Sequence, residues 1–381
     1  MKLDAFTLRT HPLGEVAARI LDAAIAAVDP EPLTGAAVAD VAGDGDVIVA
    51  GGGKAGLAMA RGIVAVLGDR ARGVVVVPAG TGAPDRVGGV RIVEGSHPLP
   101  DERSVAAGEA LLDLVSRARA EDIVLCPISG GGSALMCVPM EGVTLEQIRE
   151  DTLAWLHGGL AIEGINERRA AIDRIKHGGL ARAAGSARVI GLVLADVADP
   201  MRVASGPTAL AGVHNVVLAS NDTAVQAAAE AARAEGCEVE VLPPLRGEAR
   251  LAGVALGRRI ADAPPTDAVR CWIAGGETTV TVRGAGKGGR NQELALAAAP
   301  QLLGLRHALL VAFATDGVDG PTDAAGAVVD ASTIARAIEL GRDPATHLAD
   351  NDAYPFFAAL EDLLRPGPTG TNVADLALLF S

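Results

Sequence analysis

The most informative stretch of this chain is Asp46-Val-Ile-Val-Ala-Gly51-Gly-Gly-Lys-Ala-Gly56. A short apolar run ends in consecutive glycines, and helix-forming residues follow, so the stretch predicts a strand, a tight turn and a helix. Glycines at such a turn let backbone N–H groups approach a ligand closely, and phosphate is the usual ligand there. Two similar turns, Ser129-Gly-Gly-Gly-Ser133 and Gly275-Gly-Glu-Thr-Thr, also follow apolar runs. Three such turns indicate a site that handles phosphate groups.

Apolar strand-like runs alternate with helical stretches along the rest of the chain, which indicates an α/β fold with largely parallel sheets. Four consecutive valines in 73–77 are typical of a strand buried on both faces. The alternation of Thr and Val in 278–283 predicts a half-exposed antiparallel strand. We expect a hinge at 206–212, helices at 12–28, 55–67, 104–118, 223–235, 251–261 and 292–303, and further strands at 123–128, 189–194, 213–218, 238–242, 269–274 and 307–314.

Composition narrows the class of protein. The 381 residues allow two or three domains. A net charge of −14 argues against a nucleic-acid or anionic-membrane partner. No apolar run approaches the roughly 20 residues that a bilayer span needs, and the N-terminal residues do not resemble a signal peptide. The four cysteines form no C-x-x-C pair, which is typical of reduced thiols, so we expect a cytoplasmic location.

The first glycine turn has two interpretations. Gly51-x-Gly53-x-x-Gly56 matches the dinucleotide-binding fingerprint, but the next predicted strand ends in Pro78-Ala79-Gly80 and lacks the acid that binds ribose. Lys54 lies inside the turn, where an ammonium group suits a highly charged phosphate chain. The P-loop pattern is absent. We predict that Lys54 contacts phosphate, and the alternative is a tight turn with a solvated lysine.

Two other loops predict anion sites. Successive N–H groups in Ser129–Ser133 can form an anion nest, to which two hydroxyls add donors. A serine nucleophile is the rival interpretation, although the G-x-S-x-G elbow is absent. The loop Arg283-Gly-Ala-Gly-Lys-Gly-Gly-Arg290 opens a predicted helix, and the helix N-terminus, the glycines and the two cations Lys287 and Arg290 together favour an anion.

Several polar residues are candidates for binding a substrate. His97 lies beside two prolines and is either a donor to a carboxylate or phosphate or a structural hydrogen-bonding residue. Arg169 and Lys176 would share a face with Asn166 if one helix carries them, and the alternative is a solvated charged face. Asp196 follows a predicted strand, at the end where α/β proteins bind ligands.

Three carboxylates, Asp316, Asp319 and Asp323, lie within eight residues. Magnesium bound to phosphates takes one or two protein carboxylates, so the run is a candidate Mg²⁺ site. A series of aspartate turns is the alternative interpretation.

Taken together, these motifs resemble the glycerate 2-kinase family, whose C-terminal part carries the MOFRL region. The matching segments run in order along nearly the whole chain, and the most specific are Ile128-Ser-Gly-Gly-Gly-Ser-Ala-Leu135, Gly275-Gly-Glu-Thr-Thr-Val-Thr-Val-Arg283, Gly288-Gly-Arg-Asn-Gln-Glu293, Asp319-Gly-Pro-Thr-Asp-Ala-Ala-Gly326 and Gly367-Pro-Thr-Gly-Thr-Asn372. The resemblance implies transfer of the γ-phosphoryl group of ATP to the 2-hydroxyl of D-glycerate, with Mg²⁺, to give 2-phospho-D-glycerate. A homodimer stays one option for its assembly.

The resemblance also implies an α/β fold with two domains. Residues 1–212 would form a Rossmann-like parallel-sheet domain and residues 213–381 a mixed-sheet α/β domain containing the MOFRL region, with the site in the cleft between them. Our hypothesis is that Lys54 and Arg290 neutralise the transferring phosphoryl group and that Asp196 orients or deprotonates the acceptor hydroxyl. The other predicted roles are phosphate or nucleotide binding by Gly52, Gly53, Ser129, Gly130, Gly131, Gly132, Ser133, Lys287, Gly288 and Gly289, substrate binding by His97, Asn166 and Arg169, and metal binding by Asp316 and Asp319.

The chain departs from the family pattern near the acceptor side. Ala195 stands where the family usually has a serine, the loop 196–205 is short, and the segment after Thr208 reaches Val213 almost at once. Three alternatives therefore stay open: a kinase for another small sugar acid, an NAD(P)H-dependent hydroxypyruvate reductase, and a non-catalytic protein that binds phosphate or a sugar acid.

Overall fold

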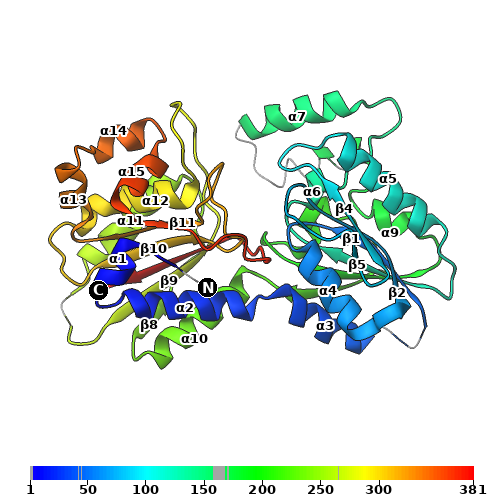
Figure 1. Cartoon of the computed structure of the whole chain (residues 1–381), viewed down its shortest axis with the longest axis horizontal. Coiled ribbons are helices and arrows are strands. Elements are labelled where there is room, and N and C mark those ends of the chain that lie inside the picture. Colours follow the sequence, from blue (N-terminus) through cyan, green and yellow to red (C-terminus); the bar gives the residue numbers. More distant parts are fainter. Residues whose placement is uncertain (1–2, 42, 44, 158–167, 170, 265) are drawn as a thin grey trace. The chain divides into compact units, whose positions relative to one another are not determined.

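The computed structural model describes residues 3–41, 43, 45–157, 168–169, 171–264 and 266–381 (Figure 1). The chain forms two compact units. Unit 1 comprises Met1–Val28, Asn221–Thr369 and Ala374–Ser381, and unit 2 comprises Asp29–Ser220 and Gly370–Val373. Each unit is built around one sheet with helices packed on it. The predicted fold class, two α/β domains, is confirmed.

Among the described residues, the sheet of unit 2 contains seven strands, which are β1 (Val47–Gly52), β2 (Ala71–Pro78), β3 (Arg86–Val87), β4 (Val90–Gly95), β5 (Ile123–Ile128), β6 (Arg188–Leu194) and β7 (His214–Ala219). Their order across the sheet is β3-β4-β2-β1-β5-β6-β7. Neighbouring strands are parallel, except that β3 runs antiparallel to β4. This is the Rossmann-like arrangement expected of the first domain.

Strand β2 shows why this sheet needs helices on both faces. Val74 and Val76 belong to the same core as Leu111 of α5 (Glu102–Ser116). Val75 and Val77 point the other way, toward the first residue of α4 (Gly56–Leu67). Figure 1 shows α4 and α5 on opposite faces of the sheet. The remaining helices of unit 2 are α3 (Pro30–Val41), α6 (Gly132–Leu135), α7 (Leu145–His157), α9 (Gly179–Ala183) and the 3₁₀ segments η1 (Gly68–Arg70) and η2 (Pro200–Ser205).

The sheet of unit 1 contains six strands within the described part of the chain, which are β8 (Glu238–Val241), β9 (Arg270–Gly276), β10 (Leu309–Ala314), β11 (Gly326–Asp330), β12 (Leu363–Leu364) and β13 (Asp375–Phe380). Their order is β12-β11-β10-β13-β9-β8, and the sheet is mixed because β8 and β9 are parallel whereas the other pairs are antiparallel. A mixed sheet is what we expected of the second domain.

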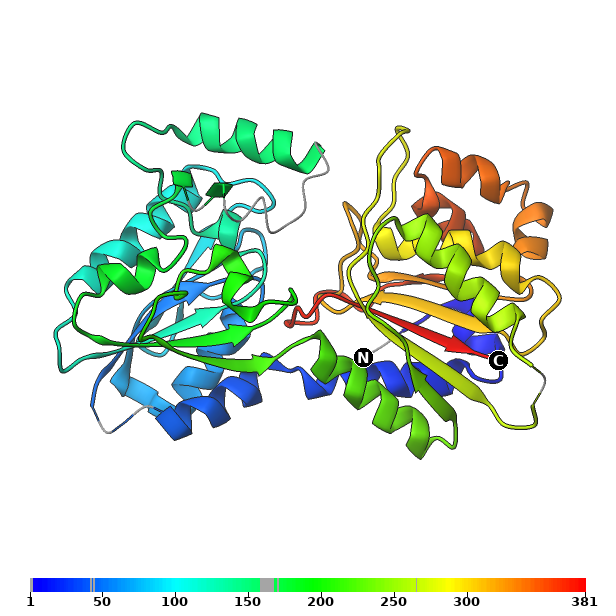
Figure 2. The same cartoon turned by 180° about the vertical axis from the view of Figure 1, so that it is seen from behind.

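Helices cover both faces of the unit 1 sheet, as Figures 1 and 2 show. One face carries α1 (Phe6–Thr10), α2 (Gly14–Ala27) and α10 (Asn221–Ala234), and the other carries α11 (Ala249–Ala261), α12 (Arg290–Ala298), which continues into η3 (Ala299–Leu302), and α15 (Ala353–Leu360). The shorter helices α13 (Thr333–Glu339) and α14 (Pro344–Ala349) complete the unit. Within the described residues, none of these helices or those of unit 2 is long and apolar enough to cross a bilayer.

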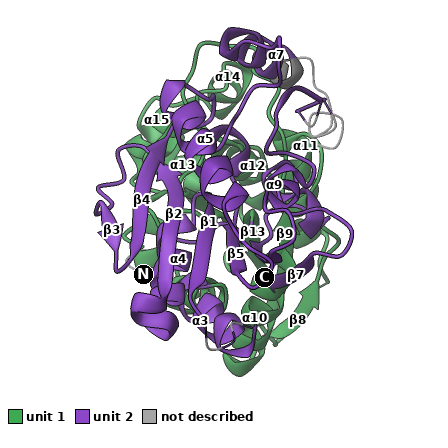
Figure 3. Cartoon of the chain, turned by 90° about the vertical axis from the view of Figure 1, so that its right-hand side faces the viewer, with its two compact units in different colours: residues 1–28, 221–369, 374–381 green, residues 29–220, 370–373 purple. Residues whose placement is uncertain are grey.

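The two units divide the chain differently from the predicted boundary at residue 212 (Figure 3). The first 28 residues belong to unit 1 because α2 packs against α10. The strand β7 stays in unit 2 because it pairs with β6. The predicted hinge at 206–212 is wrong for a related reason, since Gly178 and Ala181 donate their N–H groups to the carbonyls of Gly206 and Pro207 and tie this segment into unit 2.

The predicted strand at 278–283 is also wrong. The chain leaves β9 at Gly276, whose φ of 125° few other residues adopt. Thr279 then forms a single bridge with Glu248, which precedes α11, and Val282 is 74% exposed. The alternation of Thr and Val is real, but the segment lies against the entrance of a helix rather than beside a strand. The other predicted strands and helices are confirmed to within a few residues.

Candidate active site

Two of the glycine turns in unit 2 are joined by hydrogen bonds. The N–H of Lys54 donates to the carbonyl of Gly130 at 2.8 Å, and the N–H of Ser129 donates to the carbonyl of Gly52 at 3.3 Å. The hydroxyl of Ser129 accepts from the N–H of Ala55 at 3.1 Å and is fully buried. This hydroxyl therefore holds the turn that precedes α4, and its predicted contact with a ligand stays a prediction.

Charged and polar side chains closely approach the second glycine turn, at Gly130 and Gly131. A Cβ atom on Gly130 would lie 1.9 Å from Oδ2 of Asp196. A Cβ atom on Gly131, whose φ is 81°, would lie 3.1 Å from Cγ of Lys54 and 3.2 Å from Cδ2 of His97. Glycine at both positions thus allows three of the predicted site residues to surround the loop. The structure brings together Lys54, His97 and Asp196, which lie far apart in the sequence.

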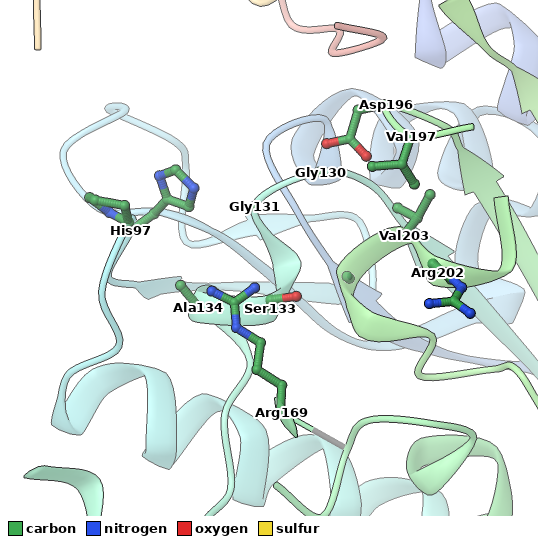
Figure 4. Close-up of a pocket in the computed structure, with 12 residues that line it drawn as sticks. His97, Gly130, Gly131, Ser133, Ala134, Arg169, Asp196, Val197, Arg202 and Val203 are labelled. Carbon is green, nitrogen blue, oxygen red and sulfur yellow. The ribbon is translucent and has the colours of Figure 1, made fainter. Parts of the chain in front are cut away.

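The loop forms one wall of a pocket of about 130 Å³ (Figure 4). The residues that line it are His97, Pro98, Gly130, Gly131, Ser133, Ala134, Arg169, Asp196, Val197, Arg202, Val203 and Ala204. In Figure 4 the guanidinium of Arg169 extends toward Ser133, and Asp196 lies beside Gly130. Two guanidinium groups and an imidazole against one carboxylate suit a small anion that also carries a hydroxyl group.

Arg169 is the predicted cation that reaches this pocket. It is half-buried, and burial lowers the pKa of its guanidinium, although the acidic groups of Cys137 and Asp173 oppose that effect. A guanidinium that has lost part of its hydration gains more from an anionic ligand than an exposed one does. The predicted partner Asn166 lies outside the described residues.

Lys176 does not share a helix face with Arg169, so that part of the prediction is wrong. Asp173 breaks the helix by bridging to Pro139, and its carboxylate accepts from the N–H of Val138 at 3.2 Å. Lys176 is 2% exposed, donates to the carbonyl of Met136 and lies 3.6 Å from Asp173. Its ammonium group therefore stabilises the structure behind the pocket.

The wall opposite the glycine loop has an unusual backbone. Ala204 and Ser205, in η2, have φ values of 53° and 60°, in the left-handed region that such residues seldom adopt. The hydroxyl of Ser205 lies 2.7 Å from the hydroxyl of Ser133, which lines the pocket. Strained backbone of this kind is concentrated at functional sites. The contact fixes the Ser133 side chain at the edge of the pocket.

Two residues at this site, Arg202 and Asn372, were not among those predicted from the sequence. Arg202 lines the pocket, and its Nε lies 3.3 Å from Asp199. Asn372 donates from Nδ2 to Oδ2 of Asp196 at 3.2 Å. Asn372 lay in a motif that matched the family, but nothing in the sequence linked it to Asp196. No pattern in the sequence singled out Arg202.

In the basic loop of unit 1, residues 283–290, carboxylates of the protein itself accept backbone N–H groups. The N–H of Ala285 donates to Asp350 at 3.1 Å, and the N–H of Lys287 donates to Asp352 at 2.9 Å. The ammonium of Lys287 lies 4.3 Å from the centre of the Tyr354 ring. The prediction that the N–H groups of this loop receive phosphate is wrong for these residues, because two aspartates far along the chain occupy them.

The N-terminus of α12 is occupied in the same way. The carboxylate of Asp319 accepts the N–H groups of Asn291 at 3.2 Å and Gln292 at 2.9 Å, and a Cβ on Gly289 would lie 2.4 Å from it. Burial, and next the charge of Asp375, raise the pKa of Asp319 to about 7. The N–H groups of Asn291 and Gln292 are thus occupied by Asp319, while the phosphate contact predicted for Gly288 and Gly289 stays a prediction.

Arg290, the first residue of α12, is fixed by ion pairs. Its Nε and Nη2 donate to the two carboxylate oxygens of Asp375 at 2.5 and 2.9 Å, and its Nη1 donates to Glu277 at 2.6 Å. Burial lowers the pKa of Arg290, but the charge of Asp375 outweighs that effect, so the pKa lies above its ordinary value. Arg290 therefore presents a permanently charged group in a fixed orientation.

The residues predicted to bind Mg²⁺ differ in how well they fit a metal. Both oxygens of Asp319 accept backbone N–H groups, so this carboxylate does not fit. Asp316 is half-buried, and one of its oxygens accepts the N–H of Val318 at 3.0 Å. In the part of the chain that the structure describes, no three His, Cys, Asp or Glu residues are grouped to hold a metal ion. Asp316 fits the single carboxylate that a phosphate-bound Mg²⁺ needs.

Comparison with known proteins places this fold and pocket in a family. Residues 16–232 match the family model described as a domain of unknown function (DUF4147), and residues 270–375 match the MOFRL family. The crystal structure of glycerate kinase from Thermotoga maritima is similar with a TM-score of 0.85 and 35% sequence identity, over 96% of this chain and 98% of that chain.

Proteins of similar sequence belong to the same glycerate kinase family. Glycerate 2-kinase of Pyrococcus horikoshii is 35% identical over 88% of this chain and 87% of its own length. D-Glycerate 2-kinase of Thermotoga maritima is 36% identical over 87% and 90%. A putative hydroxypyruvate reductase of Agrobacterium vitis is 36% identical over 96% and 94%. The chain belongs to the glycerate kinase family, so the resemblance seen in the sequence is confirmed.

Proposed function

We propose that this chain is a kinase that transfers the γ-phosphoryl group of ATP to the 2-hydroxyl of D-glycerate, giving 2-phospho-D-glycerate and ADP. The names of the relatives in Pyrococcus horikoshii and Thermotoga maritima support the reaction class. The observation that carries the proposal is the pocket in which Asp196, His97 and Arg169 face one small space. Its volume of about 130 Å³ is well below the roughly 300–1,000 Å³ of pockets that enclose larger ligands, so it suits a small acid rather than a nucleotide.

The acceptor would be held by complementary charge. Arg169 and His97 bind the glycerate carboxylate, and Asp196 accepts a hydrogen bond from the 2-hydroxyl and takes its proton. The transition state of phosphoryl transfer is loose, so orientation of the acceptor contributes more than the strength of the base. Lys54, beside Gly131 at the rim of the loop, neutralises the charge on the transferring phosphoryl group.

Two further residues have proposed roles toward the nucleotide. Arg290 is the proposed contact to the phosphates of ATP; Asp375 and Glu277 hold its orientation and balance its charge. Asp316 would hold the Mg²⁺ that accompanies ATP, and this ion supplies further charge neutralisation when bound. D-Glycerate and ATP are the proposed small-molecule partners.

A nicotinamide-dependent reductase is not favoured by the first glycine turn. Gly51 and Gly52 lie inside β1, and Cβ atoms there would lie 2.2 Å from the carbonyl oxygen of Pro127 and 2.5 Å from that of Val76. These glycines therefore allow neighbouring strands to approach. The next strand ends at Pro78 without a ribose-binding acid. Two relatives named putative hydroxypyruvate reductase share this family, so the activity must still be measured.

The test is to measure ADP release from Mg·ATP with D-glycerate, with a four-carbon sugar acid, and with no acceptor. The proposal predicts rapid release with D-glycerate alone. Preference for the longer acid would reassign the substrate but keep the kinase. Oxidation of NADH or NADPH by hydroxypyruvate, with no ADP release, would overturn the proposal.

A further inference from the structure

A segment from the C-terminal part of the chain contributes to the pocket of unit 2. Gly370–Val373 belongs to unit 2, whereas the residues on either side belong to unit 1. Within it, Thr371 and Val373 are buried, and Asn372 is 8% exposed. Three of these four residues are therefore buried in succession, and this burial restricts where the Asn372 side chain can lie.

The side chain of Asn372 meets Asp196 over the second glycine turn. Its Nδ2 donates to Oδ2 of Asp196 at 3.2 Å. A Cβ atom on Gly130 would lie 1.9 Å from that oxygen and 2.2 Å from Nδ2 of Asn372, so the pair lies directly on the glycine. Any larger residue at position 130 would separate the two groups. The close approach of the carboxylate, the amide and a backbone without a side chain is specific to this point of the pocket.

We infer that Asn372 is a positioning residue that holds the Asp196 carboxylate in line for the acceptor hydroxyl. This inference rests on the proposed function, in which Asp196 takes the proton of the 2-hydroxyl. An amide donor favours the ionised carboxylate and restrains its rotation, as the orienting group of a catalytic triad restrains its base. Asn372 itself does not touch the reacting atoms.

The charges around Asp196 favour the same assignment. His97, Arg169 and Arg202 line the pocket with it, Lys54 lies beside the loop, and Asp199 follows three residues later. A neutral donor such as Asn372 restrains the carboxylate without competing for the anionic substrate. An acid in place of Asn372 would instead repel Asp196.

The test compares Asn372→Asp with Asn215→Asp. The first change keeps the shape of the side chain, removes the donor and places a second carboxylate beside Asp196. The control makes the same change at a half-buried amide of unit 2, which donates to the carbonyl of Thr208 at 3.2 Å and does not line the pocket. For both variants and the wild type, kcat, KM for D-glycerate and the pH profile of kcat/KM are measured, with Asp196→Asn as the reference for a lost base.

We expect Asn372→Asp to lower kcat about 10- to 100-fold, with KM for D-glycerate within about threefold of the wild type, since misplacing a reacting group by about 1 Å can lower the rate about 100-fold. The acidic limb of kcat/KM moves to higher pH, because Asp196 then protonates more readily. Asn215→Asp leaves all three quantities unchanged. An unchanged kcat, or a lower kcat with an unmoved acidic limb, would overturn the inference. Failure of the proposed function is distinguishable, because the wild type would then be inactive or Asp196→Asn fully active.

Discussion

Replacing Asp319 with asparagine should change how the stability of this protein depends on pH. Asp319 is 2% exposed and caps α12 by accepting two backbone N–H groups. Burial and the neighbouring charge of Asp375 raise its pKa from 3.8 to about 7 in the folded state. Asparagine has a similar shape but no titratable group, and its single oxygen can accept only one of the two N–H groups. That loss does not depend on pH, so the change of the difference with pH reports the ionisation of Asp319.

Because the pKa of Asp319 is raised on folding, its contribution to stability decreases as the pH rises. A carboxyl group whose pKa is raised on folding stabilises the folded state fully below its unfolded pKa, and that contribution disappears as the pH rises through the folded pKa. The shift of about three units from 3.8 to about 7 corresponds to about 4 kcal/mol at about 1.4 kcal/mol per unit. Between pH 5.5 and 8 the contribution should fall by about 2 kcal/mol.

Urea unfolding of the wild type and Asp319→Asn at pH 5.5 and pH 8 measures this difference. The free energy of unfolding of the wild type minus that of the variant should be about 2 kcal/mol lower at pH 8 than at pH 5.5. Asp343→Asn is the control, because Asp343 caps α14 at the surface and hydrogen bonding from Thr346 lowers its pKa, so its contribution is constant across this range. If the difference in the free energy of unfolding between the wild type and Asp319→Asn is the same at both pH values, the pKa of Asp319 is not raised in the folded state.

Three further changes test the site and the fold. Lys54→Ala should lower kcat at least about 100-fold with the unfolding temperature unchanged, because a lost charge contact to the transition state costs about that factor; a kcat within threefold of the wild type would remove Lys54 from the mechanism. Arg169→Ala should raise KM for D-glycerate about 10- to 100-fold, since a hydrogen bond to a charged group contributes about 1.5–3 kcal/mol. The same change at the exposed neighbour Arg168 should leave KM unchanged. Equal effects of the two changes on KM would contradict the role of Arg169 in binding the substrate. Asp362→Ala should destabilise the protein by about 3–5 kcal/mol, because the change leaves the guanidinium of Arg336 without its buried carboxylate. Glu361→Ala at the surface should cost under about 1 kcal/mol. Equal unfolding midpoints for the two variants would contradict the importance of the buried pair.

The parallel sheet of unit 2 could be predicted because its signals are local. Apolar runs that end in glycine mark β1 and β5, and the glycines of both turns are needed where the strands meet. Lys54 and Asp196 could be named for the same reason, since each directly follows a buried strand or its turn. The order of the strands also follows from the known preferences of such sheets.

The anion sites of unit 1 could not be predicted, because their partners are distant in the sequence. The glycines and cations of 283–290 are visible, but the aspartates that fill the loop come from 350–352, and the one that caps α12 is Asp319. The pairing of Asn372 with Asp196 spans 176 residues and has no local pattern. The alternation in 278–283 failed as well, because the residues beside it decide whether an extended segment joins a sheet.

The proposed activity of this chain is phosphorylation of D-glycerate at its 2-hydroxyl. The most direct measurement incubates the wild type with Mg·ATP and D-glycerate, adds enolase without phosphoglycerate mutase, and follows the absorbance of phosphoenolpyruvate. Enolase accepts only the 2-phosphate, so a rise in absorbance that depends on the chain, ATP and D-glycerate is the predicted result. Release of ADP with no phosphoenolpyruvate, or no turnover of either substrate, would contradict the claim.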